Sequence, residues 1–116
     1  NKKDVNQYQF LEVVKDLKNF SYKNNSTVLI RSIPIKNKLI NIIASPKGVW
    51  SIATPEINLK TRYHGAGDLT TALFANYLTQ KISEKKILEG LTNDIFQIIS
   101  KKRKKNKFKS TSLSSL

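Results

Sequence analysis

The sequence contains no cysteine and only one histidine, His64. Without cysteine, the chain has no disulfide framework and no thiolate metal site. A lone histidine without partner ligands does not make a metal site either, so we predict no metal ligands in this chain. His64 directly precedes a glycine-rich turn, and we interpret it as a loop residue rather than a general base.

Long hydrophobic runs are also missing. No apolar stretch approaches the length of a membrane span, although 39% of the residues are hydrophobic. The N-terminal residues lack the charged-then-apolar layout of a signal peptide. We therefore expect a cytoplasmic protein that does not contact membranes. At 116 residues the chain is at most one small domain, with enough apolar residues to build a core.

Acidic residues are scarce: 8 Asp and Glu stand against 21 Lys and Arg, giving a net charge of +13. Seven of the basic residues lie in Lys101–Lys109, and without them the net charge falls to +6. This low-complexity run and the Ser-rich end predict a disordered basic tail over residues 101–116. A nucleic-acid-binding module acting through Lys101–Lys109 is an alternative function, but we find no groove-reading motif or stacking-aromatic pattern.

Residues 1–100 alternate between helical and extended patterns. Apolar residues recur at helical spacing over 6–20, and Ser83 begins a second amphipathic stretch that runs to residue 100. Three short apolar runs, at residues 27–33, 39–44 and 49–53, predict strands. The continuous apolar run at 27–33 is typical of a parallel strand that is covered on both faces. The pattern predicts an α/β domain over residues 1–100.

A glycine-rich turn leads into a further helix, predicted from Asp68 to about residue 81. Gly65 and Gly67 flank the small Ala66, so the backbone can turn tightly with its N–H groups accessible. A helix that starts here would direct unpaired N–H groups and its positive dipole end at an anion. Asp68 would suit proton removal from an attacking hydroxyl, or it is simply the N-cap of the helix. The small side chains of Ala72 and Ala75 would permit close packing of this helix on the sheet.

The stretch Gly65-Ala66-Gly67-Asp68 followed by Leu-Thr-Thr-Ala-Leu-Phe resembles the late signature of ribokinase-like small-molecule kinases, and among them most closely the pyridoxal kinases. The resemblance implies an α/β, three-layer fold with a mostly parallel sheet flanked by helices, of which this chain is the C-terminal part. It implies that Gly65, Ala66 and Gly67 form an anion hole. It also implies that Asp68 is the catalytic base and contacts the substrate.

The resemblance extends upstream of the turn. Val28-Leu29-Ile30-Arg31 is similar to a family strand that ends near the nucleotide phosphates, which makes Arg31 and Ser32 candidate ATP-binding residues. Residues 54–57 follow a strand whose family counterpart borders ATP. These candidate ATP-binding residues are Thr54, Pro55, Glu56 and Ile57. The resemblance ends near Ser100.

The implied function is ATP-dependent phosphorylation of the 5′-hydroxyl of pyridoxal to pyridoxal 5′-phosphate, in vitamin B6 salvage. The implied partners are ATP, Mg²⁺ and a pyridoxal-type molecule, and the complete enzyme would be a homodimer. Since family domains are more than twice this length, we expect a fragment that carries the ATP side of the site. The absent part would supply the acceptor pocket and the acidic residues that help to hold magnesium. Another ribokinase-like kinase, acting on a sugar, nucleoside or hydroxymethylpyrimidine, is the principal alternative.

Overall fold

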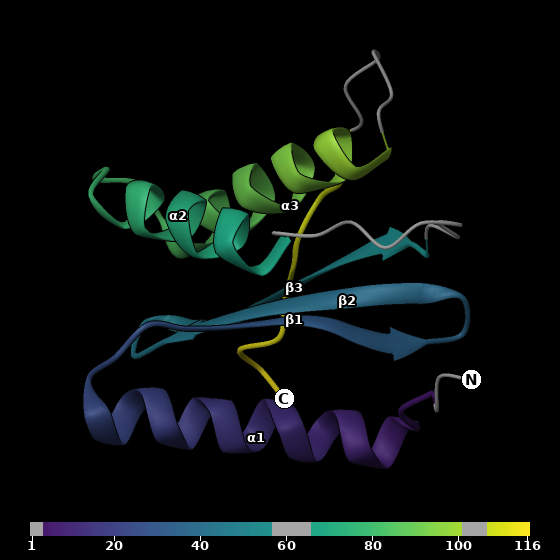
Figure 1. Ribbon diagram of the computed structural model, residues 1–116. Helices are drawn as coiled ribbons and strands as arrows, with labels where there is room; N and C mark the ends of the chain where they lie inside the picture. The colour runs from purple at the N-terminus through teal and green to yellow at the C-terminus, as the bar shows by residue number, and fades with distance from the viewer. Residues whose placement is uncertain (1–3, 57–65, 101–106) are drawn as a thin grey trace.

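The computed structural model describes residues 4–56, 66–100 and 107–116. In chain order the elements are α1 (Gln7–Asn24), β1 (Val28–Ile35), β2 (Lys38–Ser45), β3 (Gly48–Pro55), α2 (Ala66–Leu78), α3 (Glu84–Ser100) and β4 (Thr111–Ser112). The strands form one sheet in the order β1-β2-β3-β4. Helix α1 covers one face of the sheet, and α2 and α3 cover the other (Figure 1).

The sheet corrects the prediction of a mostly parallel arrangement. Within the described ranges, each pair of neighbouring strands is antiparallel. Parallel neighbours need a crossover of a dozen or more residues, whereas β1 and β2 are joined by Lys36 and Asn37 alone. Both turn residues have positive φ angles, 46° and 64°, as a two-residue hairpin turn requires. A continuous apolar run reports burial on both faces, and it does not report strand direction.

The helix ends follow from local hydrogen bonding. Asn6 caps α1, because its side chain accepts from the N–H of Gln9 while the Gln9 side chain accepts from the N–H of Asn6, at 2.8 and 2.9 Å. The helix runs past the predicted end to Asn24 and stops at Asn25, which has a left-handed backbone with φ 49°. Ser83, the predicted start of the second amphipathic stretch, accepts from the N–H of Lys86 at 3.3 Å and caps α3.

Two separate clusters of buried side chains lie on the two faces of the sheet. The cluster beneath α1 joins helix and strand residues: Val14, Leu17, Ile33, Ile42, Ala44 and Val49. The cluster beneath α2 and α3 comprises Ile43, Ile52, Ile87 and Leu88, with Leu29 and Phe74 packed against it. Adjacent residues Ile42 and Ile43 are both 0% exposed and enter opposite clusters, as the alternation of a strand requires.

Residues 107–116 differ from the predicted disorder, because they pack along the sheet. β4 pairs with Trp50 and Ser51 of β3, and the N–H of Leu113 donates to the carbonyl of Val49 at 2.7 Å. Leu113 also packs against the cluster beneath α1. Lys18 of α1 then donates to the carbonyl oxygens of Ser114 and Leu116 at 3.2 and 2.7 Å. The end of the described chain therefore closes the β3 edge and reaches the α1 side.

Helices α2 and α3 meet around Tyr77. Its hydroxyl donates to Asp94 Oδ2 at 2.6 Å. Burial, this hydrogen bond and the charge of Asp94 together raise the pKa of Tyr77 to about 12. A Cβ added at Gly90 would lie 2.7 Å from the Tyr77 oxygen and 2.8 Å from Cζ. The glycine inside α3 thus makes room for the Tyr77 ring.

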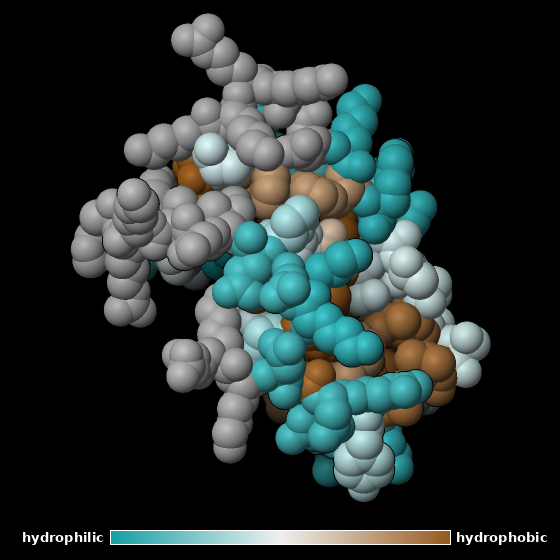
Figure 2. Space-filling model, turned by 90° about the vertical axis from the view of Figure 1, so that its right-hand side faces the viewer, coloured by the Kyte–Doolittle hydropathy of each residue, from teal (hydrophilic) through white to brown (hydrophobic). Residues whose placement is uncertain are grey.

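The surface combines polar and apolar side chains. Figure 2 shows hydrophobic side chains reaching the surface beside hydrophilic ones on one end of the molecule. The exposed large apolar residues include Tyr8, Phe20 and Tyr22 of α1, each more than half exposed. Among the helices that the structure describes, we find none with the length and apolarity needed to cross a membrane.

Candidate functional site

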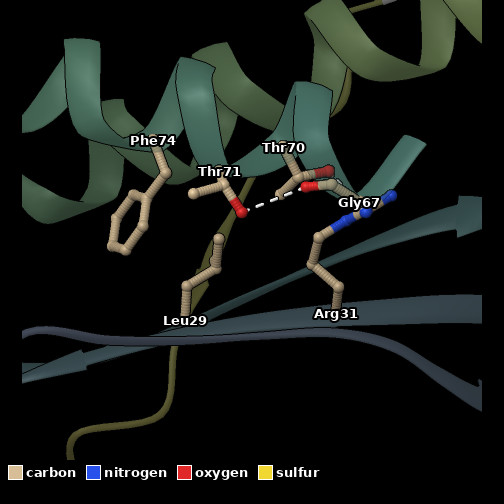
Figure 3. Close-up of a pocket in the computed structure, with 6 residues that line it drawn as sticks. All are labelled: Leu29, Arg31, Gly67, Thr70, Thr71 and Phe74. Atoms are coloured by element: carbon tan, nitrogen blue, oxygen red, sulfur yellow. Dashed lines mark hydrogen bonds between the residues drawn. The ribbon is translucent and has the colours of Figure 1, made fainter. Parts of the chain in front are cut away.

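A pocket with a volume of about 330 Å³ lies between strand β1 and helix α2. Its lining residues are Leu29, Arg31, Gly67, Thr70, Thr71 and Phe74 (Figure 3). Leu29 and Phe74 form an apolar end, and Arg31 lies at the other end beside Gly67 and Thr70. The pocket therefore combines a hydrophobic wall with a cationic group at the start of a helix.

One face of α2 supplies four of the lining residues. Gly67, Thr70, Thr71 and Phe74 have the spacing i, i+3, i+4 and i+7, so they share one side of the helix. The predicted packing of Ala72 and Ala75 on the sheet is wrong, because both are exposed. The apolar residues of α2 are too evenly distributed for the pattern alone to select the buried side.

The start of α2 has the geometry that an anion site needs. The helix begins at Ala66, so its first N–H groups have no partner within the helix. A Cβ added at Gly67 would meet no atom within 4 Å, so the helix start is open on this side. Asp68 lies in the first turn and its side chain is exposed. The third predicted anion-hole residue, Gly65, lies outside the described residues.

Arg31 supplies a fixed positive charge next to this helix start. Its Nη1 donates to Thr70 Oγ1 at 2.5 Å, and Thr70 is only 7% exposed. The Arg31 Nε–H is buried and has no hydrogen-bond partner among the described residues. Burial lowers the pKa of the guanidinium, but an arginine stays protonated in proteins. A half-buried charge with a buried spare donor favours an anionic partner.

The other predicted ATP-binding residues do not line this pocket. Ser32 is exposed, and Thr54 is buried in β3. Pro55 and Glu56 are exposed at the end of β3, where the Glu56 N–H donates to the Asn37 carbonyl at 3.0 Å. Ile57 lies outside the described residues. Of the upstream candidates within the described ranges, the structure brings only Arg31 to the α2 start.

The position of Arg31 also differs from the prediction. We expected it at the carboxyl end of a strand, but β1 continues to Ile35. Arg31 and Ser32 together face the single residue Asn41 of β2, since Ile30 pairs with Ile42 and Ile33 with Ile40. This β-bulge lies in the middle of the strand, and sequence periodicity gave no sign of it.

Sequence reasoning identified the polar half of the pocket and missed its walls. Leu29, Thr70, Thr71 and Phe74 were not predicted as site residues, although the last three follow the Gly65–Asp68 motif directly. The i, i+3, i+4, i+7 spacing from Gly67 was the available signal. No sequence signal marked Leu29 as a pocket residue, because the packing of a strand against a distant helix is set by tertiary structure.

Comparisons with known proteins support a kinase-type fold. No protein-family model matches the sequence, and no curated protein matches it. Among solved structures, the chain is similar to the crystal structure of a Bacteroides thetaiotaomicron protein assigned as a phosphomethylpyrimidine kinase, with a TM-score of 0.70 and 26% sequence identity. The match covers 86% of this chain and 34% of that protein.

The chain has a kinase-like fold. The match fits the ribokinase-like superfamily that the Gly65–Asp68 motif resembles, and it spans about a third of the neighbour's length. Within the described ranges, no three His, Cys, Asp or Glu residues cluster as a metal site. We therefore assign no magnesium ligand to these residues.

Proposed function

We propose that this chain carries the phosphate-binding part of an ATP-dependent small-molecule kinase. The observation that carries the proposal is the junction of Arg31 with the open start of α2 at Gly67. Helix N–H groups and a guanidinium converge there on one side of a pocket, and phosphates are the common ligands of such junctions. The similarity to a protein assigned as a kinase supports the same reading.

In this proposal, each residue has a distinct role. Arg31 and the N–H groups of Ala66 and Gly67 hold phosphate oxygens and stabilise the charge that develops during transfer. Asp68, exposed in the first turn of α2, accepts the proton of the attacking hydroxyl. ATP supplies the transferred γ-phosphoryl group when bound. Magnesium would be held by phosphate oxygens together with groups outside the described residues.

The acceptor class that we propose is an aromatic nitrogen heterocycle with a hydroxymethyl group. The 5′-hydroxyl of pyridoxal fits the motif resemblance, and a hydroxymethylpyrimidine fits the structural neighbour. We rank pyridoxal first, since the Gly65–Phe74 stretch most resembles the pyridoxal kinases. A cytoplasmic homodimer remains our prediction for the complete enzyme.

The test is a turnover assay on the polypeptide encoded by the full reading frame, with pyridoxal and hydroxymethylpyrimidine as acceptors. Asp68→Asn should retain ATP binding and lower turnover by about 10²- to 10⁴-fold, the usual cost of losing a general base. Asp16→Asn, an exposed change on α1, is the matched control and should leave turnover unchanged. Turnover within about threefold of wild type in Asp68→Asn would exclude Asp68 as the base.

A further inference from the structure

The β-bulge of β1 lies at Arg31 and Ser32. Two residues, Arg31 and Ser32, occupy the space opposite Asn41. The extra residue lets Ile30 and Ile33, three apart in sequence, both contact the cluster beneath α1. Arg31, two residues after Leu29, faces the α2 side, where its guanidinium meets Thr70 (Figure 3). The bulge thus returns the strand to the apolar face directly after the cation.

The conformation of the bulge is unfavourable for the residues present. Ser32 has φ 65°, in the left-handed region that favours glycine. A bulged residue also leaves a backbone group without a ladder partner. Here the Ser32 N–H donates to the side-chain Oδ1 of Asn41 at 2.9 Å. The side chain of Asn41 therefore replaces the missing ladder bond.

Asn41 also anchors the bulge to the helical layer. Its Nδ2 donates to Thr92 Oγ1 of α3 at 3.1 Å, and Thr92 is 2% exposed. One amide side chain on β2 therefore links the strand that carries Arg31 to a buried position of α3. Loss of this amide removes the hydrogen bonds to Ser32 and to Thr92 together.

We propose that Asn41 is a positioning residue for the phosphate-binding Arg31, and this inference rests on the proposed function. Asn41 does not line the pocket. It acts by holding Ser32 in the left-handed conformation that keeps the Arg31 guanidinium against Thr70 and the start of α2. Without the amide, β1 relaxes at Ser32 and the guanidinium leaves its position.

Calorimetric titration of the 116-residue chain with ATP tests the proposal. Asn41→Ala should weaken ATP binding by about 3- to 10-fold, the effect of one net hydrogen bond. In a chain that already carries Ser32→Gly, the same substitution should weaken binding by less than about twofold, because glycine adopts a positive φ without strain. The matched control is Ser21→Ala, which removes a hydrogen bond of a buried side chain on α1, on the face of the sheet opposite α2.

Two results would overturn the proposal. One is an equal loss of affinity in Asn41→Ala and Ser21→Ala, which would mean that only general stability matters. The other is an undiminished loss of affinity for Asn41→Ala in the Ser32→Gly chain, which would mean that Asn41 does not act through the bulge.

A spectroscopic measurement separates this inference from the proposed function. The buried Nε–H of Arg31 gives an NMR resonance that reports the guanidinium environment without ATP. Asn41→Ala should shift this resonance, and the added Ser32→Gly should restore it. If the wild-type chain does not bind ATP, the proposed function fails at this site. The resonance then decides whether Asn41 positions Arg31, and an unchanged resonance in Asn41→Ala overturns the inference.

Discussion

The two faces of the sheet are built from the same strands but differ in chemistry. The face beneath α1 is mainly apolar, with Ile33, Ile42 and Val49 buried in one cluster. The face beneath α2 and α3 has an apolar centre, but its β1 and β2 residues also include Arg31 and Asn41, which are hydrogen-bonded to the helices. One face thus packs as an apolar core, and the other gives up apolar contact for a cation at a pocket.

The largest expected effect comes from truncating neighbouring isoleucines that face opposite ways. Ile42→Ala and Ile43→Ala should each lower the free energy of unfolding by about 2–5 kcal/mol, because both side chains are fully buried. Urea denaturation measures this loss. Of the two, only Ile43 belongs to the cluster against which Leu29 and Phe74 of the pocket pack, so only Ile43→Ala should also weaken ATP binding by the folded chain. Equal ATP affinity in the two variants would contradict the division of the faces.

The next effect concerns the charge at the pocket. Arg31→Ala should weaken ATP binding by about 10- to 100-fold, since a charge-assisted hydrogen bond contributes about 1.5–3 kcal/mol. Arg31→Lys should fall between wild type and Arg31→Ala, because lysine keeps the charge and loses the planar fork. Lys18→Ala removes one positive charge on the α1 side and is the control for net charge. Similar losses in Lys18→Ala and Arg31→Ala would show that ATP responds only to overall charge.

A third substitution tests packing above the polar face. Helix propensity alone favours Gly90→Ala by about 1 kcal/mol. The new Cβ would instead collide with the Tyr77 ring and displace its bond to Asp94. We expect Gly90→Ala to lower the free energy of unfolding by about 1–3 kcal/mol in urea titrations. The same change in a chain that carries Tyr77→Leu should be neutral or stabilising, and a stabilising effect with Tyr77 intact would contradict the packing.

The smallest effect is a pH dependence at the C-terminal segment. Desolvation raises the pKa of Glu89, but hydrogen bonds from the N–H and hydroxyl of Ser110 and the charges of Lys85 and Lys109 outweigh it, so the pKa lies below the ordinary value of 4.5. A lowered folded-state pKa stabilises the fold above pH 4.5 and loses that contribution as the pH falls through the folded pKa.

Glu89→Gln should therefore flatten the loss of stability between about pH 5 and about pH 3, measured as the shift in urea midpoint. The matched control is Glu12→Gln, an exposed change on α1. If the urea midpoint falls with pH identically in Glu89→Gln and in wild type, the charged Glu89 carboxylate does not stabilise the fold through Ser110.

The sequence was sufficient to predict elements whose signals are local. Periodicity located α1, α3 and the three main strands. The Gly65–Asp68 motif pointed to the start of α2, where the structure places a pocket. These features depend on residues within a few positions of one another.

Features that depend on distant contacts were not predicted. The antiparallel order was missed because continuous apolar runs carry no information on direction. The bulge at Arg31 depends on an Asn41 side chain nine residues away from Ser32. The order of residues 107–116 depends on hydrogen bonds with residues far upstream, such as Lys18 and Val49. These contacts offset a composition that is typical of disorder.

The contacts of Lys18 also bear on how the protein is made. Its two carbonyl acceptors lie 96 and 98 residues further along the chain. Because translation proceeds from the N-terminus, α1 and the hairpins can form early. The hydrogen bonds of Lys18 to Ser114 and Leu116 can form only after these residues have left the ribosome. Contacts of such long sequence separation slow folding. The contacts on the α1 side therefore form only after residues 113–116 have been made, and the place of Leu113 beside the cluster beneath α1 stays open until then.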